Sequence, residues 1–152
     1  EQGGEGVCVA RRCERRGRRV RPWWTDTGRE IANVGMYGRE ANSRGSPIKT
    51  FTSPRQQVDR AITDSEQGGF VKIHVREGSD HILGATIVSR DAGDMISQIT
   101  LAMVAGVGLR TLAKVIHAYP TKTEAFREAA MAYNRNRLTP RVLARLQRRL
   151  AP

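Results

Sequence analysis

The sequence has few cysteines, few aromatic side chains and no apolar run long enough to cross a bilayer. Cys8 and Cys13 are its two cysteines. Because no secretory context accompanies them, we expect no structural disulfide and a cytoplasmic protein. The polar, Gly- and Arg-rich start predicts no secretory leader, and the short apolar runs predict no membrane partner. The first residue is Glu1 and not Met, so we expect upstream sequence to be missing.

The motifs that would hold a cofactor or a metal ion are also absent. There is no P-loop, no HExxH pair and no CxxC pair. Residues 106–108 supply two glycines of a dinucleotide fingerprint, but the third is missing and the segment follows a predicted helix instead of a strand. The three histidines are scattered without a carboxylate or cysteine cluster at metal spacing, which argues against a zinc or iron site. The sequence therefore predicts no cofactor and no metal held by this chain alone.

The net charge of +11 lies mainly at the two ends of the chain. Residues 1–22 hold seven Arg and three acids, and residues 135–152 hold six Arg and no acid. The middle of the chain is close to neutral, and it shows no basic stripe of the kind that follows nucleic acid. A basic nucleic-acid binder that works through its tails stays open as an alternative function, although nucleic acid is not the expected partner.

Composition divides the chain into three parts. We expect a disordered basic lead over residues 1–21, a folded domain over residues 22–134, and a basic helix or tail over residues 135–152. In the folded part, residues 70–76 alternate between apolar and polar, residues 77–80 suit a turn, and residues 82–89 suit a returning strand. Further predicted strands cover residues 23–25, 34–37 and 47–52, with a turn or helical turn at 27–32. Predicted helices cover residues 39–44, 91–105, 109–115, 121–133 and 141–150. Strands followed by helices predict an α+β fold, with an antiparallel sheet and helices packed on one side.

The segment of residues 116–126 carries the most chemical information. Pro120 turns an extended stretch into a helix, and His117, Tyr119 and Glu124 gather around that turn, where a polar site could form. Thr121 and Glu124 also have the spacing of a capping box, which satisfies backbone amides and implies no catalysis. From the residues alone both interpretations stay open, and the capping box is favoured.

This segment resembles the His-Pro-Thr-x-x-Glu motif that closes the dimerisation domain of FAD-dependent pyridine nucleotide-disulfide oxidoreductases. That family includes dihydrolipoamide dehydrogenase, glutathione reductase and mercuric reductase. Other segments resemble the family in the same order and spacing, from about Pro22 to Tyr133. They are residues 22–35 (around EIANVG), 59–61 (DRA), 69–73 (GFVKI), 82–85 (ILGA) and 92–96 (AGDMI).

The resemblance implies a dimerisation domain that forms a two-fold homodimer. It also implies an intact parent oxidoreductase that uses FAD and NAD(P)H and carries the upstream FAD and NAD(P) domains. We expect this chain alone to hold no FAD and to be inactive. The predicted helix with Met95, Ile99 and Met103 is expected to supply dimer contacts. A stand-alone homodimeric interaction module without redox activity is the alternative.

In the family, the catalytic His of one subunit reaches the flavin and redox disulfide of the other, and the Glu orients it. The resemblance places Tyr119 in that His position and His117 two residues earlier. A phenol has an ordinary pKa of about 10, against about 6.5 for imidazole, so it is a poor proton shuttle for a thiol. Mercuric reductases carry Tyr at this place, which favours a mercuric reductase-like parent, although this chain does not end in their cysteine pair.

The candidate catalytic residues are therefore Tyr119, Glu124 and His117. We expect Tyr119 to point into the partner's active site with its hydroxyl available to a thiolate, and Glu124 mainly to cap its own helix. Cys8 and Cys13 have the C-x4-C spacing of the family's redox disulfide. They lie in an Arg-rich lead without a preceding dinucleotide fold, however, so we interpret the spacing as coincidence.

Overall fold

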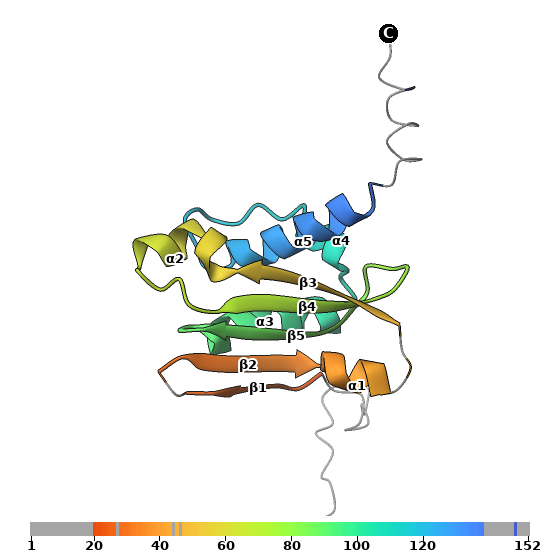
Figure 1. The fold of residues 1–152 in the computed structure, drawn as a ribbon, viewed down its shortest axis with the longest axis horizontal. Helices are drawn as coiled ribbons and strands as arrows, with labels where there is room; N and C mark the ends of the chain where they lie inside the picture. Colours follow the sequence, from red (N-terminus) through yellow and green to blue (C-terminus); the bar gives the residue numbers. More distant parts are fainter. Residues whose placement is uncertain (1–19, 27, 44, 46, 139–147, 149–152) are drawn as a thin grey trace, which may run out of the picture.

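The computed structural model describes residues 20–26, 28–43, 45, 47–138 and 148. Its centre is a five-stranded antiparallel sheet in the order β1-β2-β5-β4-β3 (Figure 1). The strands are β1 Pro22–Thr25, β2 Glu30–Gly35, β3 Ile48–Pro54, β4 Phe70–Arg76 and β5 Ile82–Ser89. The helices are α1 Gly38–Ser43, α2 Asp59–Thr63, α3 Ala92–Val104, α4 Leu109–Leu112 and α5 Glu124–Asn136, with a 3-10 turn at Arg55–Gln57. The predicted disordered lead and the predicted helix at 141–150 fall almost entirely outside the described residues.

The central hairpin follows directly from the alternation in the sequence. Val71 and Ile73 of β4 are fully buried, and they pair with Ile87 and Ala85 of β5. These side chains form the face of the sheet that the long helices cover, because successive residues of a strand point to opposite faces. The predicted hairpin and the predicted α+β fold are both confirmed.

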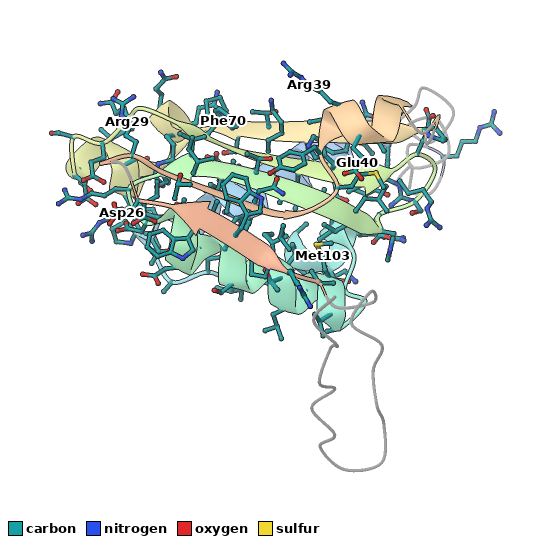
Figure 2. All side chains as sticks on the ribbon, turned by 90° about the horizontal axis from the view of Figure 1, so that it is seen from below. Asp26, Arg29, Arg39, Glu40, Phe70 and Met103 are labelled. Carbon is teal, nitrogen blue, oxygen red and sulfur yellow. The ribbon has the colours of Figure 1, made fainter. Side chains whose placement is uncertain are left out.

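Helices α3 and α5 cover this face of the sheet. Helix α3 packs on β1, β2 and β5, whereas α5 packs on β3 and β4. Met95 and Ile99 are almost completely buried there, so the expectation that they supply dimer contacts is wrong. The sheet needs that apolar stripe for its own core. Figure 2 shows α1, with Arg39 and Glu40, on the other side of the sheet from the helix that carries Met103.

Strand β2 begins earlier than the sequence predicts. Residues 30–32 were expected in a turn, but Ala32 is buried and pairs with Ile87 of β5. Pairing with a strand more than fifty residues away therefore decides where β2 begins. At the end of β2, a Cβ on Gly84 would lie 2.3 Å from the carbonyl oxygen of Met36. This close backbone approach requires glycine at position 84, since no side chain fits there.

The start of α3 is fixed by β2. The N-cap residue of α3, Asp91, makes no side-chain capping bond. The Gly93 amide instead donates to Glu30 Oε2 at 2.8 Å. A carboxylate from a neighbouring strand therefore performs the capping role and satisfies an amide that the helix leaves open. Helix α4 is shorter than the predicted 109–115, and no helix in the described part of the chain is long and apolar enough to cross a membrane.

Candidate functional site

The candidate site is built on the turn that leads into α5. The Tyr119–Pro120 peptide bond is cis. Thr121 Oγ1 donates to the Ala118 carbonyl oxygen at 2.7 Å and lies 2.9 Å from the Thr123 hydroxyl. These contacts close the turn on itself and leave Tyr119 on the outside, with 69% of its surface exposed.

The Tyr119 hydroxyl is already committed to a neighbour on α2. It donates to Asp59 Oδ2 at 2.7 Å. This hydrogen bond is the main reason why the pKa of Tyr119 is raised, and the negative charge of Asp59 adds to it. The phenol therefore stays protonated at neutral pH and its single hydrogen points to Asp59. While this bond is made, the hydroxyl has no second hydrogen to donate, but its oxygen can still accept a hydrogen bond.

The predicted capping box does not form. Helix α5 begins at Glu124, and the N-cap residue Thr123 makes no side-chain capping bond. Tight backbone bonds precede the helix instead: the Glu124 amide donates to Thr121 O at 3.3 Å, and the Phe126 amide donates to Thr123 O at 3.0 Å. The first of these bonds satisfies the Glu124 amide, which a capping box would serve. The proposed role of Glu124 as a cap is therefore wrong.

Glu124 faces the candidate site instead. Its Oε1 lies 3.6 Å from Arg127 Nη1, and its Oε2 is buried without a hydrogen-bond partner. Its negative charge is a minor influence on two neighbours: it opposes the burial that lowers the pKa of His117, and it adds to the Asp59 hydrogen bond that raises the pKa of Tyr119. The structure thus brings the three predicted residues into one neighbourhood.

His117 ties the turn to α3. Its ring Nε2 lies 3.1 Å from the side-chain nitrogen of Gln98. An amide NH2 donates, so His117 accepts here and is neutral. Burial is the largest influence on the pKa of His117 and lowers it, so the neutral ring is favoured. This geometry gives His117 a tethering contact within its own chain.

Two further residues of the site were not among the predicted ones. Asp59 accepts from Tyr119, and Lys122 contacts the carboxylates of Asp64, Glu66 and Asp91. Asp59 lies in the DRA segment, so its place in a family-like motif was the available signal. A cleft of about 480 Å³ lies beside the turn. It is lined by Arg60, Asp91, Asp94, Pro120, Thr121 and Lys122.

A second acidic contact lies one turn further along α5 from Glu124. Ser53 Oγ donates to Glu128 Oε2 at 2.5 Å. Burial is the largest influence on Glu128 and raises its pKa, and the charges of Glu124 and Asp59 act in the same direction. The charges of Glu124 and Asp59 thus act on Glu128 as well as on Tyr119. Among the described residues, no three His, Cys, Asp or Glu side chains gather in a way that would hold a metal ion.

The sequence matches a known family model across most of this fold. The family described as pyridine nucleotide-disulphide oxidoreductase, dimerisation domain, matches residues 22–130. The chain is 39% identical over 103 residues to dihydrolipoamide dehydrogenase of Chaetomium thermophilum, a match that covers 68% of this chain and 20% of the relative. It is 37% identical over 103 residues to the human mitochondrial dihydrolipoyl dehydrogenase, again covering 68% of this chain and 20% of the relative. The chain spans about a fifth of the length of these curated relatives.

Solved structures show the same fold. LpdA from Mycobacterium tuberculosis superposes with a TM-score of 0.70 at 26% identity, over 74% of this chain and 24% of that one. The HOCl-induced flavoprotein disulfide reductase RclA from Escherichia coli, in its Cu(II) complex, gives a TM-score of 0.72 at 24% identity. That second match covers 76% of this chain and 26% of RclA, and it is evidence for the fold alone.

Proposed function

Because the chain belongs to the pyridine nucleotide-disulphide oxidoreductase dimerisation-domain family, we propose that it forms a two-fold homodimer and completes the active site of an FAD-dependent NAD(P)H oxidoreductase. The family match over residues 22–130 is the observation that supports this most directly, because it includes the Tyr119–Pro120 turn. The mercuric reductase-like character of the parent rests on Tyr119 in the position of the family's His.

The dimer surface is proposed on the outer side of α3 and the segment after α4. Gln98, Leu101 and Val104 follow at three-residue spacing and share one side of α3. Leu101 and Val104 are each 67% exposed, and Ile116 is 96% exposed. The contact between Gln98 and His117 joins the two segments, and we propose that the exposed apolar side chains act as one patch. A patch of this kind marks an interaction site, and it adjoins the Tyr119 turn.

The face of the sheet opposite α3 and α5, which we call the uncovered face, is proposed to contact the rest of the parent protein. Trp23 and Ile31 are 43% and 39% exposed on this face, and Phe70 and Val88 are only half-buried. Figure 2 labels Phe70 on the same side of the sheet as α1. The curated relatives extend well beyond the matched region, and their remaining chain is long enough for the FAD and NAD(P)H domains that we propose as the occupants.

FAD is assigned to those other domains and not to this chain. A polar cleft of about 510 Å³ lies where β1, β2 and the loop after α2 meet, and carboxylates make up much of its lining. They include Asp26, Glu30 and Glu66. The four carboxylates of this lining outnumber its two arginines, Arg29 and Arg90, and Arg90 is paired with Glu66. The net negative charge would repel the pyrophosphate of a dinucleotide, so this cleft does not fit FAD.

The role proposed for Tyr119 is to hold a hydrogen bond at the partner's active site without moving its proton. Its raised pKa and its bond to Asp59 keep the phenol protonated. An oxygen that accepts only would stabilise a protonated thiol or a water molecule there, and it would not stabilise a thiolate. This differs from the acid-base role that a histidine performs.

The proposal is tested on the intact protein by steady-state NAD(P)H oxidation. Tyr119→Phe removes one hydroxyl, so turnover should fall while the dimer persists. Tyr133→Phe removes a hydroxyl from a tyrosine of α5 that packs against Phe51 on the helix-covered face of the sheet, and should leave turnover unchanged. Equal turnover in Tyr119→Phe and the wild type would contradict the assigned role.

A further inference from the structure

Lys122 has an unusual concentration of charge around it. Its side chain is only 17% exposed. Its Nζ contacts Asp91 Oδ2, lies 3.1 Å from Glu66 Oε2 and lies 3.7 Å from Asp64 Oδ2. Burial alone would lower the pKa of Lys122, but the hydrogen bonds to Asp91 and Glu66 outweigh it and the pKa is raised. The ammonium group is therefore firmly charged inside a ring of carboxylates.

The three carboxylates belong to separate parts of the fold. Asp64 is the C-cap residue of α2, Glu66 lies in the loop before β4, and Asp91 is the N-cap residue of α3. Lys122 itself lies two residues after Pro120, within the turn. One side chain thus connects the turn to the end of α2, to a loop and to the start of α3.

Helix α2 contacts the turn at both of its ends. At its first residue, Asp59 accepts the hydrogen bond from Tyr119 at 2.7 Å. At its last turn, Asp64 contacts Lys122 and is held by Arg60 Nε at 2.9 Å. The orientation of Tyr119 therefore depends on a helix of five residues that Lys122 links back to the turn.

We propose that Lys122 is a positioning residue for Tyr119, because its ammonium group fixes the turn that carries the phenol against α2. The inference deepens the proposed function, and it depends on that function only for what the phenol does in a partner's site. Lys122 is mostly buried and paired with carboxylates. Removing its positive charge would leave those carboxylates without an ion-pair partner, which costs free energy. Without the Lys122–Asp64 contact, we expect the Tyr119–Asp59 hydrogen bond to weaken, because Asp59 and Asp64 lie at the two ends of the same short helix.

The experiment follows the Tyr119 phenol by NMR titration of the full chain labelled at tyrosine. The Tyr119 signal is assigned with Tyr119→Phe, and Asp59→Asn defines the fall in pKa when the acceptor is lost. We expect Lys122→Met to lower the pKa of Tyr119 toward the Asp59→Asn value, and Lys122→Arg to keep it at the wild-type value. Deleting a nearby positive charge would by itself raise the pKa of a phenol. A fall in Lys122→Met therefore identifies the loss of the Asp59 contact.

The matched control is Lys114→Met, which removes the same charge from an exposed side chain earlier in the sequence and should not lower the pKa of Tyr119. If Lys122→Met does not fold, Asp64→Asn is compared with Asp94→Asn. Both remove one carboxylate from the region of the turn, and only the first should lower the pKa of Tyr119 substantially.

A Tyr119 pKa at or above the wild-type value in Lys122→Met, or equal falls in Asp64→Asn and Asp94→Asn, would overturn the proposal. The titration needs no enzymatic activity. A failure of the proposed function, seen as unchanged NAD(P)H oxidation in Tyr119→Phe, is therefore distinguishable from a failure of this inference.

Discussion

Truncation of Leu101 measures how much the patch on α3 contributes to self-association. Leu101 is 67% exposed in the single chain, so about two thirds of its side chain is available for burial on dimerisation. Leu101→Ala removes three carbons, which contribute about 2.4 kcal/mol when all of them become buried, at about 0.8 kcal/mol for each CH2. Because about two thirds of the side chain is available for burial, the loss is about 1.6 kcal/mol per copy. A two-fold interface counts the residue twice. The dimer should therefore lose about 3 kcal/mol, which raises its Kd about two-hundredfold.

The assay is a dilution series followed by light scattering or sedimentation velocity on the wild-type chain and the variant. Alanine is the best helix former, so the substitution does not weaken α3 itself. Ile31→Ala is the matched control, because Ile31 is 39% exposed on the opposite face of the sheet. An unchanged Kd in Leu101→Ala, with a large rise in Ile31→Ala, would refute the assignment and place self-association on the uncovered sheet face.

Two further predictions concern stability. Glu30→Ala removes the carboxylate that accepts from the Gly93 amide, so thermal melting should show a loss of about 1 kcal/mol, as for other helix caps; an unchanged melting temperature would exclude a capping role for Glu30. Burial raises the pKa of Glu128 above its ordinary 4.5, so the folded chain holds this proton more tightly than the unfolded chain does. That contribution is present below the ordinary pKa and is lost as the pH rises through the raised one. Glu128→Gln should therefore melt above the wild type at neutral pH and together with it at about pH 3, whereas a difference independent of pH would point to a cause other than ionisation.

The sequence predicts the parts of the fold that depend on local pattern. Residues 70–76 and 82–89 form the expected hairpin because their alternation and the turn between them specify the same structure. The start of β2 was missed because Glu30 and Ile31 become strand only by pairing with Ser89 and Val88 of β5. Such pairing depends on the whole sheet, and a window of neighbouring residues does not contain it.

The candidate site likewise contains some residues that the sequence predicts and others that only the tertiary structure brings together. Tyr119, Glu124 and His117 were identified from one short segment that resembles a family motif. Asp59 lies sixty residues before Tyr119, and the carboxylates around Lys122 come from two other segments of the chain. Tertiary packing decides which carboxylate contacts Tyr119 and which carboxylates contact Lys122. Sequence spacing therefore predicts neither set of contacts.

The start of α5 shows how a correct local motif can fail when the backbone supplies another solution. In a capping box, Thr121 and Glu124 would bond each other's backbone amides, and their contributions would be coupled. Here the Thr121 hydroxyl bonds Ala118 O, and Glu124 lies near Arg127. We therefore expect the losses of stability in Thr121→Val and Glu124→Gln to add within about 0.5 kcal/mol in the double variant. Chemical denaturation of the four proteins measures this coupling. A coupling energy of about 1 kcal/mol or more would mean that the two side chains act together as a cap in solution.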